Sequence, residues 1–277
     1  MNNSNSKKIK ILDYILKKLC TLDFIKNKVR VIGERCLVAY NGFIFSYITT
    51  ENGEHEFGSH VAKIYNSSEF IFCDVGAHHG IYTDMILKNF PLYKGYLFEP
   101  TPESFSRLQF KFSNNADLEI NNIALSNFNG ETQLITYPDD PTRNGLKGVG
   151  KELNFASEVI SCEVKKGDDF FNQIEYINLL KIDAEGHDFN VIKGFENLIN
   201  KGSIDVIQFE YTFRHSDMRI TLRDYYEFFK SKSYKIGPIR QHGVDFYEDF
   251  DSRYNEYQHG PNYIAVRLDL VDKFYSF

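Results

Sequence analysis

The amino-acid sequence predicts an α/β protein with a mostly parallel, twisted sheet that has helices on both faces. From Phe70 onward, short apolar runs alternate with amphipathic stretches, the pattern of strand–helix–strand units. The first apolar run ends in Asp74 and turns through Gly76 and Gly80 into an amphipathic stretch. The next run ends in another acid, Glu99. Because ligands of open α/β sheets lie beyond the carboxyl ends of the strands, these features indicate a Rossmann-like fold with a binding site at that edge.

The N-terminal part of the chain has a different pattern. Residues 1–69 are predicted to form a helical and hairpin extension, and residues 70–277 the domain that carries the site. Apolar residues within 7–29 follow helical spacing, which predicts one or two amphipathic helices. Residues 1–30 contain eight Lys or Arg and two Asp, a net charge of +6, so the rest of the chain carries −12 to give the total of −6.

The rest of the extension predicts a hairpin and a loop. Residues 35–50 resemble two strands around Asn41-Gly42, a dipeptide that favours the tight turn of a β-hairpin. Residues 51–59 are polar and contain glycine, so we expect a loop there, followed by a helix that leads to Phe70.

The elements of the main domain follow from the same periodicity. The expected strands are residues 70–75, 95–99, 118–125, 131–137, 159–165, 177–183, 205–211, 234–240 and 262–268, and the expected helices are 81–89, 102–113, 187–201 and 220–232. Residues 138–155 contain three glycines and interrupt this rhythm. A connection of that length indicates a mobile lid or substrate loop, with a disordered surface insertion as the alternative.

Composition and charge narrow the classes of function. The net charge of −6 disfavours a nucleic-acid partner held through its phosphates. The four cysteines lack the spacing of metal ligands, so we expect reduced thiols, no metal site and a cytoplasmic protein. No apolar run approaches the ~20 residues that span a bilayer, and the start lacks the apolar stretch of a signal peptide.

The glycine turn narrows the choice of ligand. A dinucleotide fold needs glycine at the middle position of G-x-G-x-x-G, where this chain has His78, and an imidazole would crowd a pyrophosphate. Glu99, at the tip of the next strand, is placed to bind the hydroxyls of a ribose. An adenosine ligand without phosphates fits both features, and S-adenosylmethionine is the common one. Asp74 is placed to orient the glycine loop or the ammonium group of that ligand.

Four segments in series resemble the FkbM-type family of S-adenosylmethionine-dependent methyltransferases. They are DVGAHHGIYT at 74–83, FEPTPESFSRL at 98–108, NNIALSNFNGE at 121–131 and LLKIDAEGHDFNVIKGFENL at 179–198, within a resemblance that runs from about Phe70 to Tyr211. The family usually has Asn where this chain has His78, and often Val where it has Ala184. The resemblance implies a class I methyltransferase fold. It also implies that Ala124, Leu125 and Ser126 border the adenine.

The motifs together give a set of candidate site residues. The expected cofactor-binding residues are Asp74, Gly76, Ala77, His78, Gly80, Glu99, Pro100, Ala124, Leu125 and Ser126. The segment KIDAEGHD follows a core strand and supplies the candidate bases Asp183, Glu185 and His187. Substrate contacts are expected from the residues after the next strand, namely Glu210, Tyr211, Arg214 and His215. A Mg²⁺ site built from Asp183, Glu185 and Glu210 is an alternative that the spacing does not require.

By resemblance, the expected reaction is O-methylation of a sugar hydroxyl in a surface glycan or its nucleotide-linked precursor. A small metabolite, a lipid or a protein nitrogen is an alternative acceptor, and a non-catalytic cofactor-binding module is an alternative of another class. For the basic N-terminus, we expect packing on the domain or on a second subunit through Leu12, Ile15, Leu16 and Leu19. A weak peripheral membrane contact is the alternative.

Overall fold

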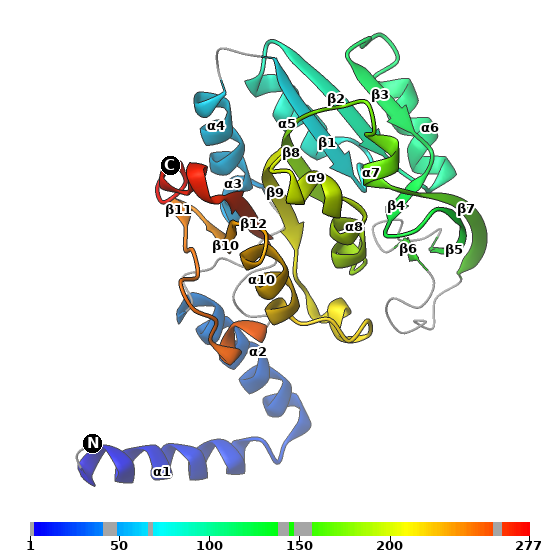
Figure 1. Ribbon diagram of the computed structural model, residues 1–277. Helices are drawn as coiled ribbons and strands as arrows, with labels where there is room; N and C mark the ends of the chain where they lie inside the picture. The colour runs from blue at the N-terminus through cyan, green and yellow to red at the C-terminus, as the bar shows by residue number, and fades with distance from the viewer. Residues whose placement is uncertain (1–2, 41–48, 66–68, 138–143, 147–156, 257–261) are drawn as a thin grey trace.

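The computed structural model describes residues 3–40, 49–65, 69–137, 144–146, 157–256 and 262–277. Its large sheet has the order β11-β10-β12-β9-β8-β1-β2-β3 (Figure 1). These strands are β1 (Phe70–Val75), β2 (Tyr93–Phe98), β3 (Leu118–Asn121), β8 (Ile177–Ile182), β9 (Ile204–Glu210), β10 (Tyr234–Arg240), β11 (Gly243–Val244) and β12 (Asn262–Arg267). Neighbours from β3 to β9 pair in parallel, and β12 runs antiparallel between β9 and β10. The Rossmann-like, mostly parallel sheet is therefore confirmed.

Helices cover both faces of this sheet. One face carries α4 (Glu54–Ile64), α5 (Ile81–Asn89) and α6 (Pro102–Lys111), and the other α7 (Gly167–Phe170), α8 (Asp188–Gly194), α9 (Glu196–Asn200) and α10 (Leu222–Lys230). Strand β1 supplies apolar side chains to the helices on both faces, because successive side chains of a strand point to opposite faces of the sheet. Phe70 and Phe72 pack with α4 and α5, whereas Cys73 and Val75 pack with the opposite layer. The described residues of the body also include the 3-10 helices η2 (Phe213–Ser216), η3 (Ser252–Asn255) and η5 (Leu268–Lys273).

A second, smaller sheet follows β3, and the sequence did not predict it. It has the order β4-β7-β5-β6, with β4 (Ala124–Ser126), β5 (Gly130–Thr136), β6 (Gly145–Leu146) and β7 (Glu158–Lys166) (Figure 1). The single strand expected over residues 118–125 is therefore wrong, because the chain leaves the large sheet after Asn121 and pairs with β7 from Ala124. Asn122 fixes this transition by donating from Nδ2 to the Glu99 carbonyl oxygen at 2.8 Å. Most of the lid prediction, at 138–143 and 147–155, lies outside the described residues.

The N-terminal extension is helical, with α1 (Asn3–Leu19), α2 (Asp23–Tyr40) and the short α3 (Thr49–Asn52). The hairpin prediction is wrong for residues 35–40, which continue α2, and Asn41-Gly42 lies outside the described residues. Extending an existing helix needs no new nucleus, which outweighs the strand preference of these side chains. The loop expected at 51–59 is also wrong, because α3 and α4 occupy most of it.

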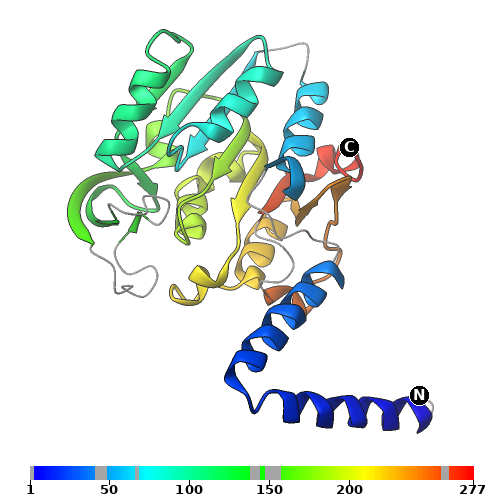
Figure 2. The ribbon, with the colours of Figure 1, turned by 180° about the vertical axis from the view of Figure 1, so that it is seen from behind.

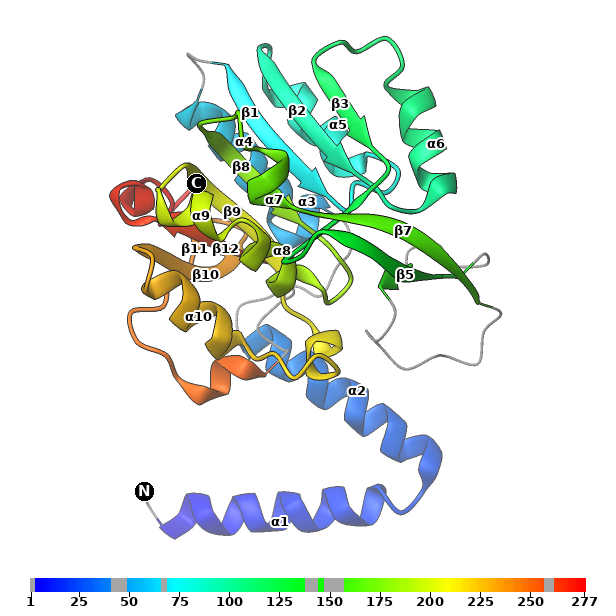
Figure 3. The ribbon, with the colours of Figure 1, turned by 45° about the vertical axis from the view of Figure 1, so that its right-hand side comes forward.

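The helices of the extension relate to the body in two ways. Phe57 and Val61 of α4 are fully buried in the core of the main domain, so α4 belongs to the body although it precedes residue 70. In contrast, α1 and α2 project from the body in all three views (Figures 1, 2 and 3). Leu12 and Ile15 are 56% and 47% exposed, so the expectation that this stripe packs on the domain is wrong.

Candidate active site

The turn between β1 and α5 is fixed by contacts within the protein. Gly76 and Gly80 adopt left-handed φ angles of +78° and +70°. A Cβ atom at Gly76 would lie 1.9 Å from the carbonyl oxygen of Asp183, and one at Gly80 would lie 2.6 Å from the ring of Phe112. Neighbouring protein atoms therefore already require these two glycines. Their expected close approach to a cofactor stays a prediction. Lys111 of α6 holds the same turn by donating to the carbonyl oxygens of His79 and Gly80 at 2.9 and 3.1 Å.

Glu99 joins this turn to the end of β2. Its Oε2 accepts the backbone N–H of His78 at 2.9 Å, and its Oε1 accepts the N–H of Thr101 at 2.8 Å. Burial raises the pKa of Glu99, while these hydrogen bonds oppose the shift. Each carboxylate oxygen can accept a second hydrogen bond, so the buried carboxylate can still accept from a ligand hydroxyl. Pro100 follows it and is partly exposed.

His78 and Ala77 complete the turn. Ala77 is buried in the core, and His78 has a φ of +47°, which is unusual for a residue other than glycine. The His78 ring stacks on His79 with 3.7 Å between centroids. Burial and the neighbouring His79 lower the pKa of His78, so its imidazole is neutral at pH 7.

Asp74 lies fully buried at the end of β1, beside a buried lysine. Its Oδ2 accepts from the hydroxyl of Thr83 at 2.7 Å, and its Oδ1 lies 3.7 Å from Nζ of Lys181. Lys181 also donates to Oδ2 of Asp183 at 3.2 Å. Burial lowers the pKa of Lys181, but Asp183, Asp74 and Glu54 outweigh that effect and raise it overall. Lys181 is therefore a permanent cation between acids of two neighbouring strands.

Sequence reasoning missed Lys181 and the polar residues beneath it. Glu54 of α4 accepts from Gln208 of β9 at 2.7 Å, and Gln208 accepts from the hydroxyl of Tyr82 at 2.6 Å. Lys181 itself interrupts INLLKI, a strand that is otherwise apolar except for Asn178. A lysine inside a run that reads as a buried strand is a signal that could have identified it, because lysine is almost never buried without a partner.

The segment after β8 carries the partly exposed acids of the site. Asp183 and Glu185 have 34% and 28% of their side chains exposed. Glu185 adopts a φ of +53° and forms an ion pair with Arg214, with 2.7 Å between Oε2 and Nη1. Burial and the charge of Asp183 raise the pKa of Glu185 to about 8, although Arg214 opposes the shift. The structure thus brings predicted catalytic and substrate-binding residues into direct contact.

Asp188, another residue that sequence reasoning missed, holds the bend of this segment. Its fully buried carboxylate accepts the N–H of Gly186 at 3.1 Å and that of Ala184 at 3.4 Å. Burial and Asp183 raise the pKa of Asp188 to about 7. His215 lies 3.7 Å away, is also fully buried, and shares a 2.9 Å hydrogen bond with the hydroxyl of Tyr225. His215 therefore supports the bend from behind, which corrects its expected role as a substrate contact.

His187 is placed against the second sheet. Its Nε2 is 2.9 Å from the hydroxyl oxygen of Ser126, and burial lowers its pKa to about 4. This buried, hydrogen-bonded imidazole is a weak base, and the geometry favours a structural role for it over the expected catalytic one. Ser126 faces α8, since a Cβ atom at Gly194 would lie 2.1 Å from its carbonyl oxygen. Ala124 and Leu125 are buried beside it in β4, and their contact with adenine stays a prediction.

The other residues predicted to contact the substrate differ in their exposure to solvent. Tyr211 is 1% exposed and packs among aromatic rings, so its direct substrate contact is corrected to a role in the core. Glu210 ends β9 and is partly exposed, like Arg214. Burial and then Asp183, Asp188 and Glu185 raise the pKa of Glu210 well above its ordinary value. Within the described residues, no group of three or more His, Cys, Asp or Glu side chains is placed to hold a metal ion.

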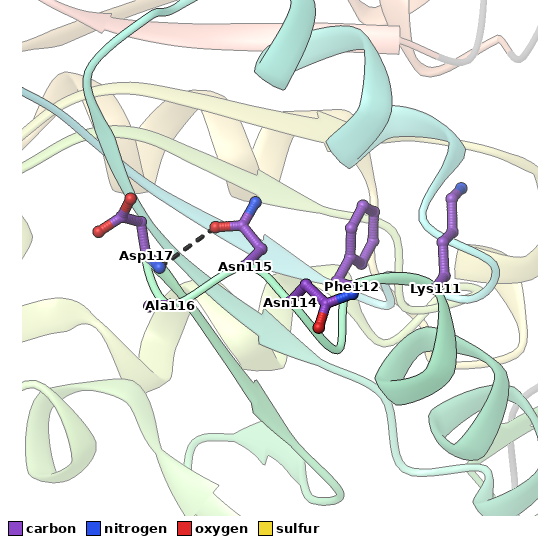
Figure 4. A pocket seen from close by; sticks show the side chains of 6 residues that line it. All are labelled: Lys111, Phe112, Asn114, Asn115, Ala116 and Asp117. Carbon is purple, nitrogen blue, oxygen red and sulfur yellow. Dashed lines mark hydrogen bonds between the residues drawn. The ribbon is translucent and has the colours of Figure 1, made fainter.

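Two buried atoms test whether the edge suits a polar ligand. Asp74 Oδ1 and His78 Nε2 have no hydrogen-bond partner in the described part of the chain. Buried polar atoms are normally paired, and these two flank the turn that Glu99 holds. A ligand with an ammonium group and ribose hydroxyls would supply the missing donors, so the residues present fit an adenosyl amino acid. A surface hollow lined by Lys111, Phe112 and residues 114–117 lies where β3 begins, whereas the acids lie where strands end (Figure 4).

The fold and this edge define a Rossmann-like protein with an acidic ligand site at the carboxyl ends of its strands. Residues 74–236 match the Methyltransferase FkbM domain, which covers more than half of the chain. The chain therefore belongs to the FkbM methyltransferase family. It is also similar to Methyltransferase 1 of Beauveria bassiana strain ARSEF 2860, at 24% identity over 160 residues, which is 50% of this chain and 64% of that protein.

The chain also has structural similarity to solved methyltransferases at low sequence identity. One is the precorrin-6y C5,15-methyltransferase of Geobacter metallireducens. The alignment covers 80% of this chain and 90% of that protein, at 10% identity and a TM-score of 0.42. Another is the plantazolicin methyltransferase BpumL, solved in complex with SAH. The alignment covers 95% of this chain and 98% of that protein, at 11% identity and a TM-score of 0.42. No helix among the described residues is long and apolar enough to cross a membrane.

Proposed function

We propose that this chain is a cytoplasmic S-adenosylmethionine-dependent O-methyltransferase that acts on a sugar hydroxyl, in a surface glycan or its nucleotide-linked precursor. One observation carries the proposal. A single edge of the sheet combines a glycine turn, the buried Glu99 that holds it, and the partly exposed acids Asp183 and Glu185. The cofactor supplies an electrophilic methyl group when bound, and the chain's residues bind it, align the acceptor and accept a proton.

Glu185 is the residue best suited to accept that proton. A sugar hydroxyl must lose its proton as the C–O bond forms, and a base works best when its pKa is near the working pH. The pKa of Glu185 is raised to about 8, and its backbone is held in a left-handed conformation that few non-glycine residues adopt. Both acids are paired with a cation, but the partner of Asp183 is the buried Lys181, whereas the partner of Glu185 is the partly exposed Arg214. We therefore assign Glu185 as general base and Asp183 as the acid that positions the acceptor.

The cofactor half of this proposal is tested by calorimetry. We expect S-adenosylmethionine and its demethylated product to bind in the micromolar range, and NAD not to bind. NAD binding as tight as that of S-adenosylmethionine would contradict the assignment of His78 as a barrier to pyrophosphate.

The acceptor half is tested by methyl transfer. Labelled S-adenosylmethionine is incubated with separated glycan, nucleotide-sugar, lipid and protein fractions of the source organism. We expect label in a glycan or nucleotide-sugar fraction, and the mass of one sugar to fall by one methylene group when the gene is deleted. Label confined to lipid or protein would reject the sugar acceptor while leaving the methyltransferase assignment intact.

A further inference from the structure

The helix α1 presents an apolar stripe to solvent. Ile9, Leu12, Ile15, Leu16 and Leu19 share one side by their helical spacing. Four of them are between 42% and 59% exposed, and Leu16 is only partly buried. Most of the stability of a helix in a protein comes from packing of its apolar face, so we expect a surface that covers this stripe of α1.

The charges around the stripe indicate what that surface is. Lys10, Lys17 and Lys18 lie on the side of α1 opposite the stripe, and all three are exposed. Residues 1–30 have a net charge of +6, with Asp13 and Asp23 as their only acids. A helix with an apolar face and a lysine-rich face has the character of helices that lie in the interface of a membrane.

A second copy of the chain is the alternative partner that could cover the apolar stripe of α1. Pairing two α1 helices would bring together two segments that each contain five Lys and one Asp, a net charge of +4. The body of a second copy carries the opposite charge, but its large exposed apolar residues are dispersed over several elements, for example Ile81, Phe110, Val159 and Phe213. They are separated in the fold and do not match a continuous helical stripe, which therefore favours lipid.

We propose that α1 binds an anionic lipid surface, with its apolar stripe between the acyl chains and its lysines at the head groups. The projection of α1 from the body in Figures 1, 2 and 3 leaves the helix free to lie along a bilayer while the catalytic edge stays in water. Such a contact would hold the enzyme beside acceptors that are attached to, or assembled at, a membrane. The proposal does not depend on the identity of the acceptor.

The test is sedimentation of the full chain with vesicles of phosphatidylcholine alone or mixed with phosphatidylglycerol. We expect binding to the anionic vesicles at low salt, and a rise in helical circular dichroism. Replacing Lys10, Lys17 and Lys18 by Gln should weaken binding about fivefold per lysine, since each contributes ~1 kcal/mol near an anionic surface. The matched control replaces the exposed body residues Lys63, Lys88 and Lys201 by Gln, and should bind as the unchanged protein does.

A second pair of variants tests the apolar stripe. Ile15→Ser with Leu19→Ser should abolish vesicle binding, whereas Asp13→Ser on the polar side should strengthen it. Equal sedimentation of the lysine variant and its control would overturn the proposal. So would a failure to bind vesicles combined with a dimer, seen by light scattering, that disappears when α1 is removed, because a second copy would then be the occupant.

Discussion

The carboxyl edge of the large sheet and the helix α1 relate charge to burial in opposite ways. At the sheet edge, Asp74, Lys181 and Asp188 are charged residue types buried in the body, and each is held by partners from other elements. In α1, apolar side chains such as Ile9 and Leu12 are more than half exposed. The buried charged groups of the edge therefore have partners within one chain, whereas the apolar stripe of α1 is left exposed by the described part of the chain.

The largest effect is expected from Glu185→Gln. Removing the proposed base should lower kcat by about 10²–10⁴-fold, the usual contribution of general base catalysis, while cofactor affinity stays within a few-fold. Because the pKa of Glu185 is raised to about 8, the rate of the unchanged enzyme should increase with pH up to that region. The variant should lose this dependence. A pH profile that keeps the same rising limb in Glu185→Gln but loses it in Asp183→Asn would assign the base to Asp183 instead.

Lys181→Met should have the next largest effect, on stability. It leaves Asp74 and Asp183 without their shared cation, and breaking a buried ion pair costs about 3–5 kcal/mol. Lys232→Met is the matched control, since it removes an ion pair to the half-exposed Glu196 that is worth at most about 1 kcal/mol. Both costs are measured by urea unfolding. Equal losses of unfolding free energy in the two variants would show that the buried ion pairs of the edge stabilise the fold no more than a surface ion pair does.

Glu99→Gln tests the connection between the turn and the cofactor. In this variant, one of the two backbone N–H groups that donate to Glu99 would face the NH₂ of the Gln side chain. The charged acceptor for ribose hydroxyls would also be lost. Calorimetry should show the affinity for the demethylated cofactor product reduced by about 1.5–3 kcal/mol. Gln at the exposed Glu103 should leave the affinity unchanged. An unchanged affinity in Glu99→Gln would remove Glu99 from the cofactor site.

The pH dependence of stability tests the buried His187. Its pKa in the folded state is about 4, below the ordinary 6.5, so the unfolded chain takes up the proton first as pH falls. The stability that the neutral imidazole contributes is therefore present above pH 6.5 and is lost as pH falls toward 4. His187→Gln should remove this loss. The unfolding free energy should then fall less between pH 7 and pH 5 than in the unchanged protein, by on the order of 1–2 kcal/mol. The exposed His242→Gln should leave the decrease as it is.

The smallest effect is expected from deleting residues 1–20, which removes α1. Because its apolar stripe contacts no core of the described body, the unfolding free energy of the remaining chain should change by less than about 0.5 kcal/mol. Thermal and urea unfolding at low protein concentration would measure this change. A loss of several kcal/mol would mean that α1 packs against protein in solution, and the contrast between the two regions would not hold.

The sequence alone determined the features that depend on local pattern. The alternation of apolar runs predicted most strands from Phe70 onward, with the strand expected over 118–125 as the exception and β6 and β11 not predicted. The helices α5, α6, α8 and α10 lie within the predicted ranges. The glycine turn with Glu99 and the acids of KIDAEGHD were expected at one edge of the sheet, and the structure brings them there, because parallel strands bring their carboxyl ends together. These signals are contained in a few consecutive residues, and the fold does not reverse them.

Tertiary structure decided what depends on residues far apart in the sequence. No local pattern shows that the chain changes sheets after Asn121, that Glu54 reaches Gln208, or that His187 and His215 become buried by β4 and α10. The hairpin expected near residue 40 failed for a related reason, since a helix begun at Asp23 extends through residues with strand preference. The role of a polar side chain follows from its burial and its partners, and both are set by contacts between elements. The sequence therefore located a candidate site, and the packing of the fold decided which of its acids, lysines and histidines are buried.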